Sequence, residues 1–283
     1  MELITDVLLD ALFDTAKMLP FLFGVYLLIE YLEHKASDRL PNALRRMGVF
    51  GPIGGAALGC LPQCGFSVAI SNLYAGRLIS LGTLIAVFVA TSDEAVPILL
   101  AHPQGGAKVV TLILTKLAVA AVAGLIIDIS LRLIKGPRNE HEEPYRDLCE
   151  DCGCEEHGVI FSALKHTAQI TLFVFLVTFL LGLGIALLGE ETLGRLLMTD
   201  SPFQPLLTAL IGLIPNCAAS VVLTDLYAAG SISFASAVSG LSTGAGLGLV
   251  VLYKTNKNLK ENLFITALLY VAGALAGMVI QLF

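Results

Sequence analysis

One stretch of the sequence occurs twice, and this duplication constrains the fold more than any other feature. Residues 52–80 match residues 205–233 at 12 of 29 positions, at a constant offset of 153 (205 − 52). Unrelated segments of this composition would match at about two or three positions, so we interpret the match as an internal duplication. Each copy sets a proline, an amide and a cysteine in an apolar run, as Pro62-Gln63-Cys64 and Pro215-Asn216-Cys217. A transporter built from repeated halves is expected to bind its substrate at such interruptions.

The rest of the chain is too apolar for a protein whose surface faces water. Of its 283 residues, 56% are hydrophobic and 14% are charged, which is too little charge to cover a soluble protein of this size. With their flanks, the longest apolar stretches can cross a bilayer as helices; they cover residues 18–32, 111–134, 170–188 and 263–283. They lack the alternation of barrel strands, so we expect an all-helical polytopic membrane protein.

The duplication extends to whole halves, because Phe161–Leu188 also resembles the first apolar helix, Leu12–His34. We expect a membrane repeat over residues 1–135, a hydrophilic linker over 136–158 and a second repeat over 159–283. With about five hydrophobic segments in each half, the second half enters the membrane from the opposite side, and the halves are inverted repeats. The Pro-broken helices, or re-entrant hairpins, would then meet near the midplane. Four segments in each half is the alternative.

The distribution of basic residues predicts the orientation in the membrane. The five-segment count puts the basic loop 36–46, Arg77, the linker 136–158 and Lys254 on one side, which the positive-inside rule assigns to the cytoplasm. Both chain ends then lie on the opposite side of the membrane. Residues 1–17 lack the features of a signal peptide, so we expect them to stay on the protein. The six cysteines do not suggest a disulfide framework.

The duplicated motifs are the first candidate site. A proline that breaks a membrane helix frees backbone carbonyls, which persist in hydrocarbon only where they line a cavity or are capped by protein. Ser67 and Ser220 follow the two cysteines by three residues, and Asn72 matches Asp225 across the halves. The expected ion-binding set from the motifs is Gln63, Cys64, Ser67, Asn72, Asn216, Cys217, Ser220 and Asp225. The alternative is a pair of packing kinks with buried, inert cysteines.

Two carboxylates inside an apolar segment are the second candidate. Thr91-Ser92-Asp93-Glu94 precedes Pro97 within a run that is otherwise apolar. Intramembrane carboxylates are costly unless they are paired or hydrated, and they commonly bind ions or carry protons. The alternative is that Ser92 and Asp93 cap a helix at the interface. The matching stretch of the second half, residues 242–246, has no carboxylate.

The linker is the third candidate. It carries Cys149, Cys152, Cys154 and His157, which are enough ligands for one zinc or soft-metal site. Their spacing matches no standard zinc finger, and a solvated acidic linker with incidental cysteines is the alternative.

The energy source and the partners follow from what the sequence lacks. It contains no Gly-x-x-x-x-Gly-Lys-Ser/Thr loop, so an ion gradient would have to drive transport. A carboxylate or thiol that releases its proton when the substrate binds would couple that gradient to the substrate, with a proton as the coupling ion. We expect a transporter, not an enzyme, with no cofactor and no nucleic-acid partner. Whether it forms a homo-oligomer stays open.

These motifs resemble the ten-helix heavy-metal exporters of bacteria, a family described both as arsenic efflux permeases and as manganese transporters. The resemblance rests on Pro62–Cys64, Pro215–Cys217, Thr91–Glu94 and Cys149–His157, and it covers the whole chain. It implies export of a toxic metal or metalloid from the cytoplasm.

The ion is left open between two classes. The two cysteines suit trivalent arsenic, above all a methylated arsenical, whereas the carboxylates and amides suit manganese. A permease for another small solute, a membrane sensor that binds metal through its linker and a membrane thiol enzyme are the alternatives. The thiol pair that an enzyme would need, Cys60 with Cys64, has no counterpart in the second half, where Leu213 replaces Cys60.

Overall fold

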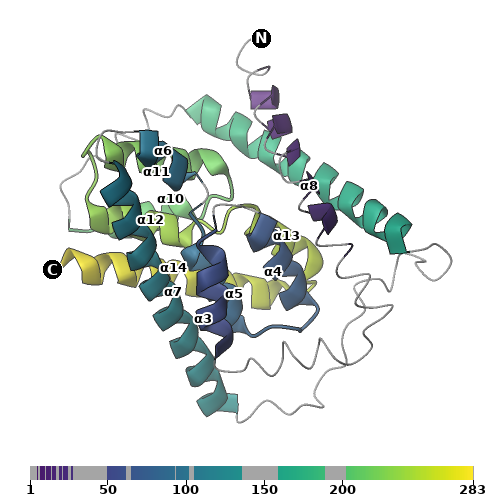
Figure 1. Cartoon of the computed structure of the whole chain (residues 1–283), viewed down its shortest axis with the longest axis horizontal. Helices are drawn as coiled ribbons and strands as arrows, with labels where there is room; N and C mark the ends of the chain where they lie inside the picture. The colour runs from purple at the N-terminus through teal and green to yellow at the C-terminus, as the bar shows by residue number, and fades with distance from the viewer. Residues whose placement is uncertain are drawn as a thin grey trace.

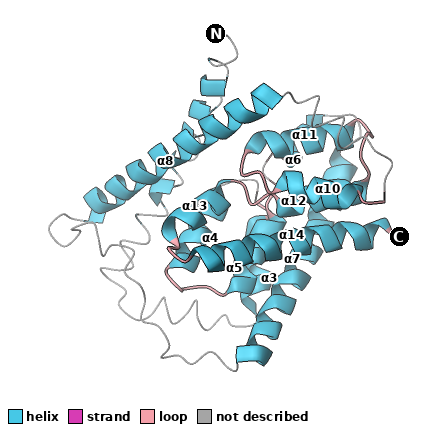
Figure 2. Cartoon of the chain, turned by 180° about the vertical axis from the view of Figure 1, so that it is seen from behind, coloured by secondary structure: helices cyan, strands magenta, loops and turns pink. Residues whose placement is uncertain are grey.

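The structure, a computed structural model of the chain, is helical throughout the part that it describes. It describes residues 50–61, 65–92, 94–101, 105–135, 159–188 and 202–282, with scattered residues between 5 and 27. Over these ranges there is no strand (Figure 2). The helices are α3 (Gly51–Gly59), α4 (Gly65–Ala75), α5 (Leu81–Ala90), α6 (Ala95–Ala101), α7 (Gly105–Lys135), α8 (Val159–Leu188), α10 (Gln204–Gly212), α11 (Cys217–Ala228), α12 (Phe234–Thr243), α13 (Leu247–Thr255) and α14 (Leu259–Gln281).

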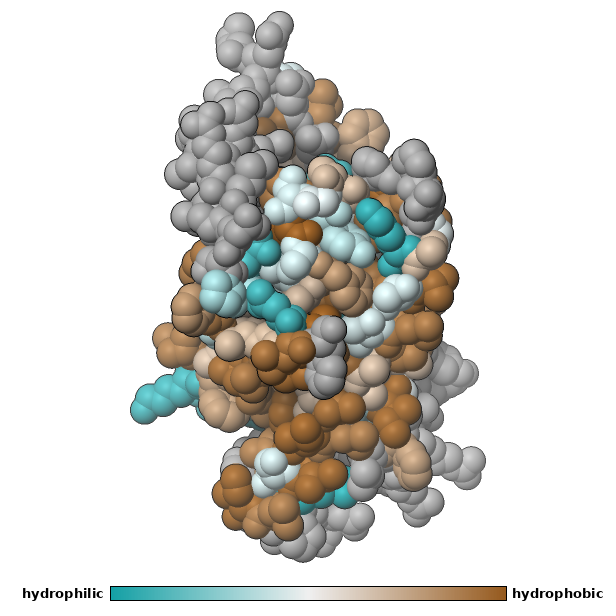
Figure 3. All heavy atoms as spheres, turned by 90° about the vertical axis from the view of Figure 1, so that its left-hand side faces the viewer, coloured by the Kyte–Doolittle hydropathy of each residue, from teal (hydrophilic) through white to brown (hydrophobic). Residues whose placement is uncertain are grey.

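Five segments of the described chain are long and apolar enough to cross a membrane. They are Leu81–Ala101, Gly106–Ile134, Ala163–Gly184, Phe234–Thr255 and Leu259–Gln281. Apolar side chains also cover much of the outer surface, and on the face in Figure 3 the hydrophilic atoms gather mainly in the upper half. The prediction of an all-helical, multi-pass membrane protein is confirmed.

Two of these segments are discontinuous, and they form the centre of the bundle. Leu81–Ala101 consists of α5 and α6, and the described residues 91, 92 and 94 between them are not helical; Phe234–Thr255 consists of α12 and α13 with an interruption at residues 244–246. Inside the bundle, 65% and 89% of their most apolar windows are buried, against 22% and 28% for the continuous helices α7 and α14. The two broken helices are therefore surrounded by protein, where interrupted backbone is tolerated in a membrane.

The same packing unit occurs around both broken helices. α3 packs against α5 and α7, and α10 packs against α12 and α14. Gly124 in α7 and Gly277 in α14 are equivalent, and a Cβ atom added at either would lie within 3 Å of equivalent neighbours. Around Gly124 these are Gly82, Pro52 and Ala86, and around Gly277 they are Ala235, Pro205 and Ser239. Every residue of the second group is the corresponding residue of the first plus 153. The absence of a side chain lets the outer helix approach the backbone of the broken helix in both places.

Each unit also contacts the other through a short helix. α4 packs against α13 of the other unit, and α11 packs against α6 (Figure 1). In the first contact, Ser71 Oγ donates a hydrogen bond of 2.7 Å to the carbonyl of Gly248. In the second, Ala95 and Leu99 of α6 lie in one buried cluster with Ala219 and Leu223 of α11. Each broken helix therefore has a partner from the other half at its second segment.

Local sequence accounts for where the broken helices begin and stop. Ser80 and Ser233 are equivalent N-caps whose hydroxyl oxygens accept hydrogen bonds of 3.1 Å from the amides of Thr83 and Ser236. The second interruption ends at Gly246, whose φ of 52° and ψ of −138° lie in a region that only glycine adopts readily. α8 lies apart from this centre and packs on α13 (Figure 1). Val174 of α8 belongs to one buried cluster with Val68 of α4 and Val251 of α13.

Candidate functional site

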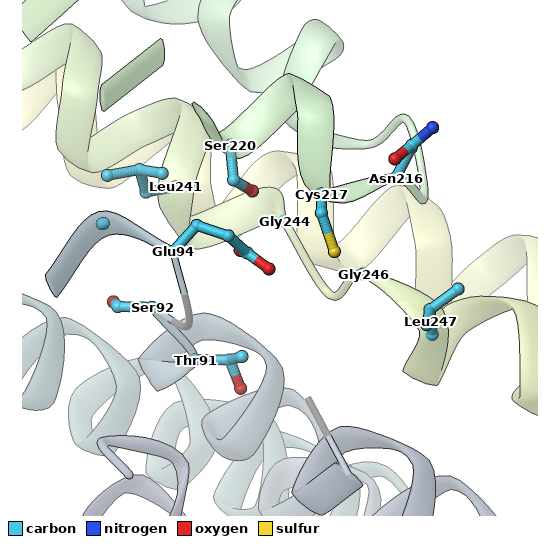
Figure 4. A pocket seen from close by; sticks show the side chains of 11 residues that line it. Thr91, Ser92, Glu94, Asn216, Cys217, Ser220, Leu241, Gly244, Gly246 and Leu247 are labelled. Atoms are coloured by element: carbon cyan, nitrogen blue, oxygen red, sulfur yellow. The ribbon is translucent and has the colours of Figure 1, made fainter. Parts of the chain in front are cut away.

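A small pocket lies where the two broken helices and the start of α11 meet. Its lining comes from Thr91, Ser92, Glu94 and Ala95 of the first half and from Asn216, Cys217, Ser220, Leu241, Gly244, Gly246 and Leu247 of the second (Figure 4). The free space at its centre is about 20 Å³, which is room for one water molecule or one ion. The pocket brings together six of the residues that the sequence analysis proposed, from motifs more than a hundred residues apart.

A carboxylate and a thiol from opposite halves point into the same space. Glu94 precedes α6, and Cys217 is the first residue of α11; Figure 4 shows the carboxylate and the sulfur turned toward the gap between the two halves. The Cys217 thiol is half-buried. Ser220 adds a hydroxyl one turn along α11. One sulfur and several oxygens form a mixed ligand set, which suits metal ions of intermediate softness and thiophilic metalloids.

Asn216 shapes this pocket as a helix cap. Its backbone is extended, with φ −142° and ψ 142°, and its Oδ1 accepts a hydrogen bond of 3.1 Å from the amide of Ala218. This is an N-cap interaction that fixes the first turn of α11. In Figure 4 the side chain points away from Glu94 and Cys217. Pro215 lies between the last residue of α10 and this cap, so the second motif coincides with the turn between two helices.

Thr91 and Ser92 form the wall of the pocket on the side of the first half. Thr91 is the C-cap of α5, and its hydroxyl donates a 2.8 Å hydrogen bond to the carbonyl of Val87. Ser92 Oγ donates to the carbonyl of Ala90 at 3.3 Å. Each hydroxyl donates its proton to a carbonyl of α5. Its oxygen keeps lone pairs that can accept a hydrogen bond or bind a cation.

Lys116 adjoins the pocket, and the sequence analysis missed it. It lies on α7, its side chain is fully buried, and its Nζ donates hydrogen bonds to the carbonyls of Thr91 and Leu241, the latter at 2.8 Å. Both acceptor residues line the pocket. A lone lysine within the apolar run 109–134 was the signal available, because a charge inside a membrane segment is rare and commonly functional.

Three proposed residues lie elsewhere in the described chain. Ser67 and Asn72 are buried in α4, and Asp225 is exposed on α11; none of them lines the pocket. Among the residues that the structure describes, neither the Nδ2 nor the Oδ1 atom of Asn72 has a hydrogen-bond partner. The residues equivalent by the 153-residue offset, Asn72 and Asp225, therefore have different surroundings.

The remaining candidates fall outside the described residues. They are Gln63, Cys64 and Asp93, together with the linker set Cys149, Cys152, Cys154 and His157. Within the ranges that the structure describes, no three His, Cys, Asp or Glu side chains are grouped so that they could hold a metal ion on their own.

Comparison with known proteins identifies the family. A family model described as "Putative, 10TM heavy-metal exporter" matches residues 1–188 and 155–283, which together span the whole chain. No curated protein and no solved structure matches. The two matches overlap over α8, and together they include every helix that contributes to the pocket. The chain belongs to this ten-helix heavy-metal exporter family.

Proposed function

We propose that this protein is a secondary-active exporter that carries a heavy-metal or metalloid ion out of the bacterial cytoplasm across the inner membrane. The observation that carries the proposal is the pocket, in which Glu94 and Cys217 from opposite halves face one ion-sized space between two broken helices. Substrate sites of transporters with repeated halves lie at such junctions, where small movements of one half against the other can expose the site to either side. We propose that the protein transports its substrate and does not transform it chemically.

We further propose that the two halves are inverted repeats of five segments each, with the linker in the cytoplasm and both termini on the opposite side. The recurring packing around Gly124 and Gly277 supports two equivalent halves. The ion pair between Arg77 and Glu261, at 2.6 Å, supports the five-segment count. It requires the turn after α4 and the start of α14 to lie on one side of the membrane, whereas the four-segment alternative separates Arg77 from the basic turn that precedes α14.

The pocket favours an ion that accepts both sulfur and oxygen ligands. The part of it that the structure describes offers one thiol, one carboxylate and several hydroxyl and carbonyl oxygens. A divalent cation of the manganese class can use the oxygens, with the sulfur as an additional ligand, and a methylated arsenical can use the thiol and few others. Both substrates fit the family description. We propose that the exchange of a proton for the ion supplies the driving force for export.

Retention of the ion by cells tests the proposal and separates the two substrates. Cells that express the wild type, Glu94→Gln or Cys217→Ser are challenged with manganese, methylarsenite or arsenite, and the retained ion is measured. Cys60→Ser is the matched control, because the Cys60 thiol is also half-buried but does not line the pocket. Manganese retention lowered by the wild type and restored by Glu94→Gln indicates a divalent-cation exporter. The same result for an arsenical with Cys217→Ser indicates a metalloid permease.

Equal retention with and without the protein, for all three ions, would contradict the exporter proposal. If the linker binds metal in that case, the result favours the alternative that the protein is a membrane metal sensor.

A further inference from the structure

The turns that end α4 and α11 are equivalent, but they carry different residues at the position that has a left-handed backbone. Arg77 has φ 60° and Gly230 has φ 75°, and the two positions are related by the offset of 153. The amide of each donates to the carbonyl of an equivalent tyrosine, at 2.9 Å to Tyr74 and at 3.1 Å to Tyr227. Glycine is typical of this position, because a Cβ atom strains the backbone there. Among the described residues, Arg77 alone of the non-glycine residues has a positive φ, and such strain commonly marks a functional position.

The side chain of Arg77 joins the two halves of the protein. Its Nη1 and Nη2 donate hydrogen bonds of 2.6 and 2.8 Å to Oε1 and Oε2 of Glu261, and Tyr74 Oη donates to the same carboxylate at 2.5 Å. Glu261 is held in the first turn of α14, where its amide donates to Oδ1 of the N-cap Asn258 at 3.3 Å. The side chains of Arg77 and Glu261 are 21% and 20% exposed. A bidentate, partly buried pair of this kind is among the stronger polar contacts.

At the opposite end of the bundle, the described residues join the halves by a weaker contact. By the 153-residue offset, Gly230 takes the place of Arg77 and Lys108 takes the place of Glu261. Lys108 Nζ lies 5.2 Å from the ring centroid of Tyr227 and 3.5 Å from the carbonyl oxygen of Ala228. Gly230 has no side chain with which to form a pair. A cation–π contact is weaker than a bidentate ion pair, so the two ends are unequally closed.

The pocket lies between these two ends. α5 begins after the Arg77 turn and leads to Thr91 at the pocket, and α6 continues from the pocket toward the start of α7. The second broken helix runs in the opposite order, because α12 begins after the Gly230 turn and α13 ends at Thr255, before Glu261. Since both halves line the pocket, a path to it opens at the end where the halves separate.

We propose that Tyr74, Arg77 and Glu261 form a latch that closes the pocket at the end that the proposed orientation places at the cytoplasm. The inference rests on the proposed function. Because the outer end is held by the weaker contact, the resting protein is closed to the cytoplasm and opens more readily to the other side. An ion enters from the cytoplasm only when the latch opens, and closure of the latch behind the ion directs its release outward. This role accounts for an arginine where glycine would be less strained.

The accessibility of the Cys217 thiol, which lines the pocket, tests the latch. Inside-out vesicles and spheroplasts present the full chain to a small, membrane-impermeant methanethiosulfonate from the cytoplasmic or from the outer face. Mass spectrometry of the Cys217 peptide gives its rate of modification separately from the other cysteines. We expect wild-type Cys217 to react faster from the outer face. Glu261→Gln and Arg77→Gly should each raise the cytoplasmic rate at least about fivefold, as loss of one charge-assisted pair predicts.

The melting temperature separates a latch from a contact that only stabilises the fold. Arg77→Gly removes the backbone strain together with the ion pair, so it should unfold at a higher temperature than Glu261→Gln. A latch predicts the same cytoplasmic rate in both variants, and no further increase when they are combined, because both act on one contact. Lys260→Gln is the matched control, since it removes an exposed charge from the same turn of α14. It should react like the wild type.

The outcomes distinguish the latch from the proposed function. Wild-type cytoplasmic rates in Glu261→Gln and Arg77→Gly, or a wild type that reacts as fast from the cytoplasm as from outside, would overturn the latch, whether or not the protein carries an ion. A higher rate in Glu261→Gln than in Arg77→Gly would also overturn it, because rates that follow stability indicate local unfolding. The expected rates without flux of any tested ion would contradict the proposed substrate and leave the latch supported. If Glu261→Gln does not fold, the rate in Arg77→Gly decides.

Discussion

At the scale of single residues, the pocket depends on backbone conformations as much as on ligands. Gly244 and Gly246 bound the interruption between α12 and α13, and both line the pocket. Only Gly246 has a positive φ, 52°. Gly244 has φ −73°, and a Cβ atom there would meet no atom closer than 3.5 Å. The two glycines therefore differ in whether an L side chain is compatible with the fold.

We expect Gly246→Ala to lower the free energy of unfolding by about 1–3 kcal/mol, because the added Cβ atom strains the backbone at this φ. Gly244→Ala is the matched control and should unfold at nearly the wild-type temperature, although its methyl group would narrow the pocket beside Ser220. Thermal unfolding of the purified variants in detergent measures both. Equal melting temperatures for the two variants would show that the interruption relaxes around Ala at Gly246.

The sequence singled out several residues that line the pocket, but not the lysine beside it. Thr91, Glu94 and Cys217 came from two motifs, because polar groups inside apolar runs are visible in a single sequence. Lys116 was missed because it has no duplicated counterpart; the equivalent position in α14 is Leu269. Its two acceptors are backbone carbonyls, which no residue type identifies.

At the scale of helices, the ends of the two halves are joined by unequal contacts. Tyr74 Oη and Arg77 both donate to Glu261, at 2.5 Å and 2.6–2.8 Å, and so join α4 to α14. At the equivalent place, Lys108 lies 5.2 Å from the ring centroid of Tyr227 and 3.5 Å from the carbonyl of Ala228, which joins α7 to α11. The first contact is a bidentate ion pair, and the second is a weak cation–π contact.

We expect Glu261→Gln to lower the free energy of unfolding by about 1–2 kcal/mol, because it removes a charge-assisted, partly buried ion pair. Lys108→Met, at the equivalent end, should lower it by less than about 1 kcal/mol. Urea or thermal unfolding in detergent compares the two. A larger loss of unfolding free energy in Lys108→Met than in Glu261→Gln would contradict this ranking of the two contacts.

The close approach of the outer helices gives a second test at this scale. A Cβ atom at Gly124 would lie 2.6 Å from the carbonyl oxygen of Gly82, whereas one at Gly106, on the same helix, would meet nothing within 4 Å. We expect Gly124→Ala to destabilise the protein by about 1–3 kcal/mol through overpacking and Gly106→Ala to be neutral within about 0.5 kcal/mol. Melting temperatures measure both; equal values would contradict the packing described for α5 and α7.

The sequence located the helices well and the interruptions in part. The polar residues Thr91–Glu94 were singled out as a candidate site, with a helix cap as the alternative, and Pro97 lies in the first turn of α6. The break at residues 244–246 was noted only as the counterpart of that stretch, because its cause is glycine conformation and not a proline or a charge. The contacts of α4 with α13 and of α11 with α6 were not predicted, since they depend on long-range packing.

At the scale of the molecule, the proposed orientation places two exposed positions on opposite sides of the membrane. Ala229 follows α11 and Lys257 precedes α14, and the broken helix α12–α13 lies between them. We expect a cysteine at Lys257 to react with a membrane-impermeant maleimide only from the cytoplasm, and one at Ala229 only from outside. Labelling of intact and of opened cells measures this. Labelling of both positions from one side would contradict the inverted arrangement.

The central claim is that the pocket carries a heavy-metal or metalloid ion across the membrane. The most direct test reconstitutes the purified chain in sealed liposomes, adds manganese or methylarsenite to one side under a pH gradient, and follows the ion on the other side. We expect flux of one of them above that of empty liposomes, lowered at least tenfold by Glu94→Gln or Cys217→Ser and unchanged by Cys60→Ser. Flux that matches empty liposomes for both ions, from folded protein, would contradict the account.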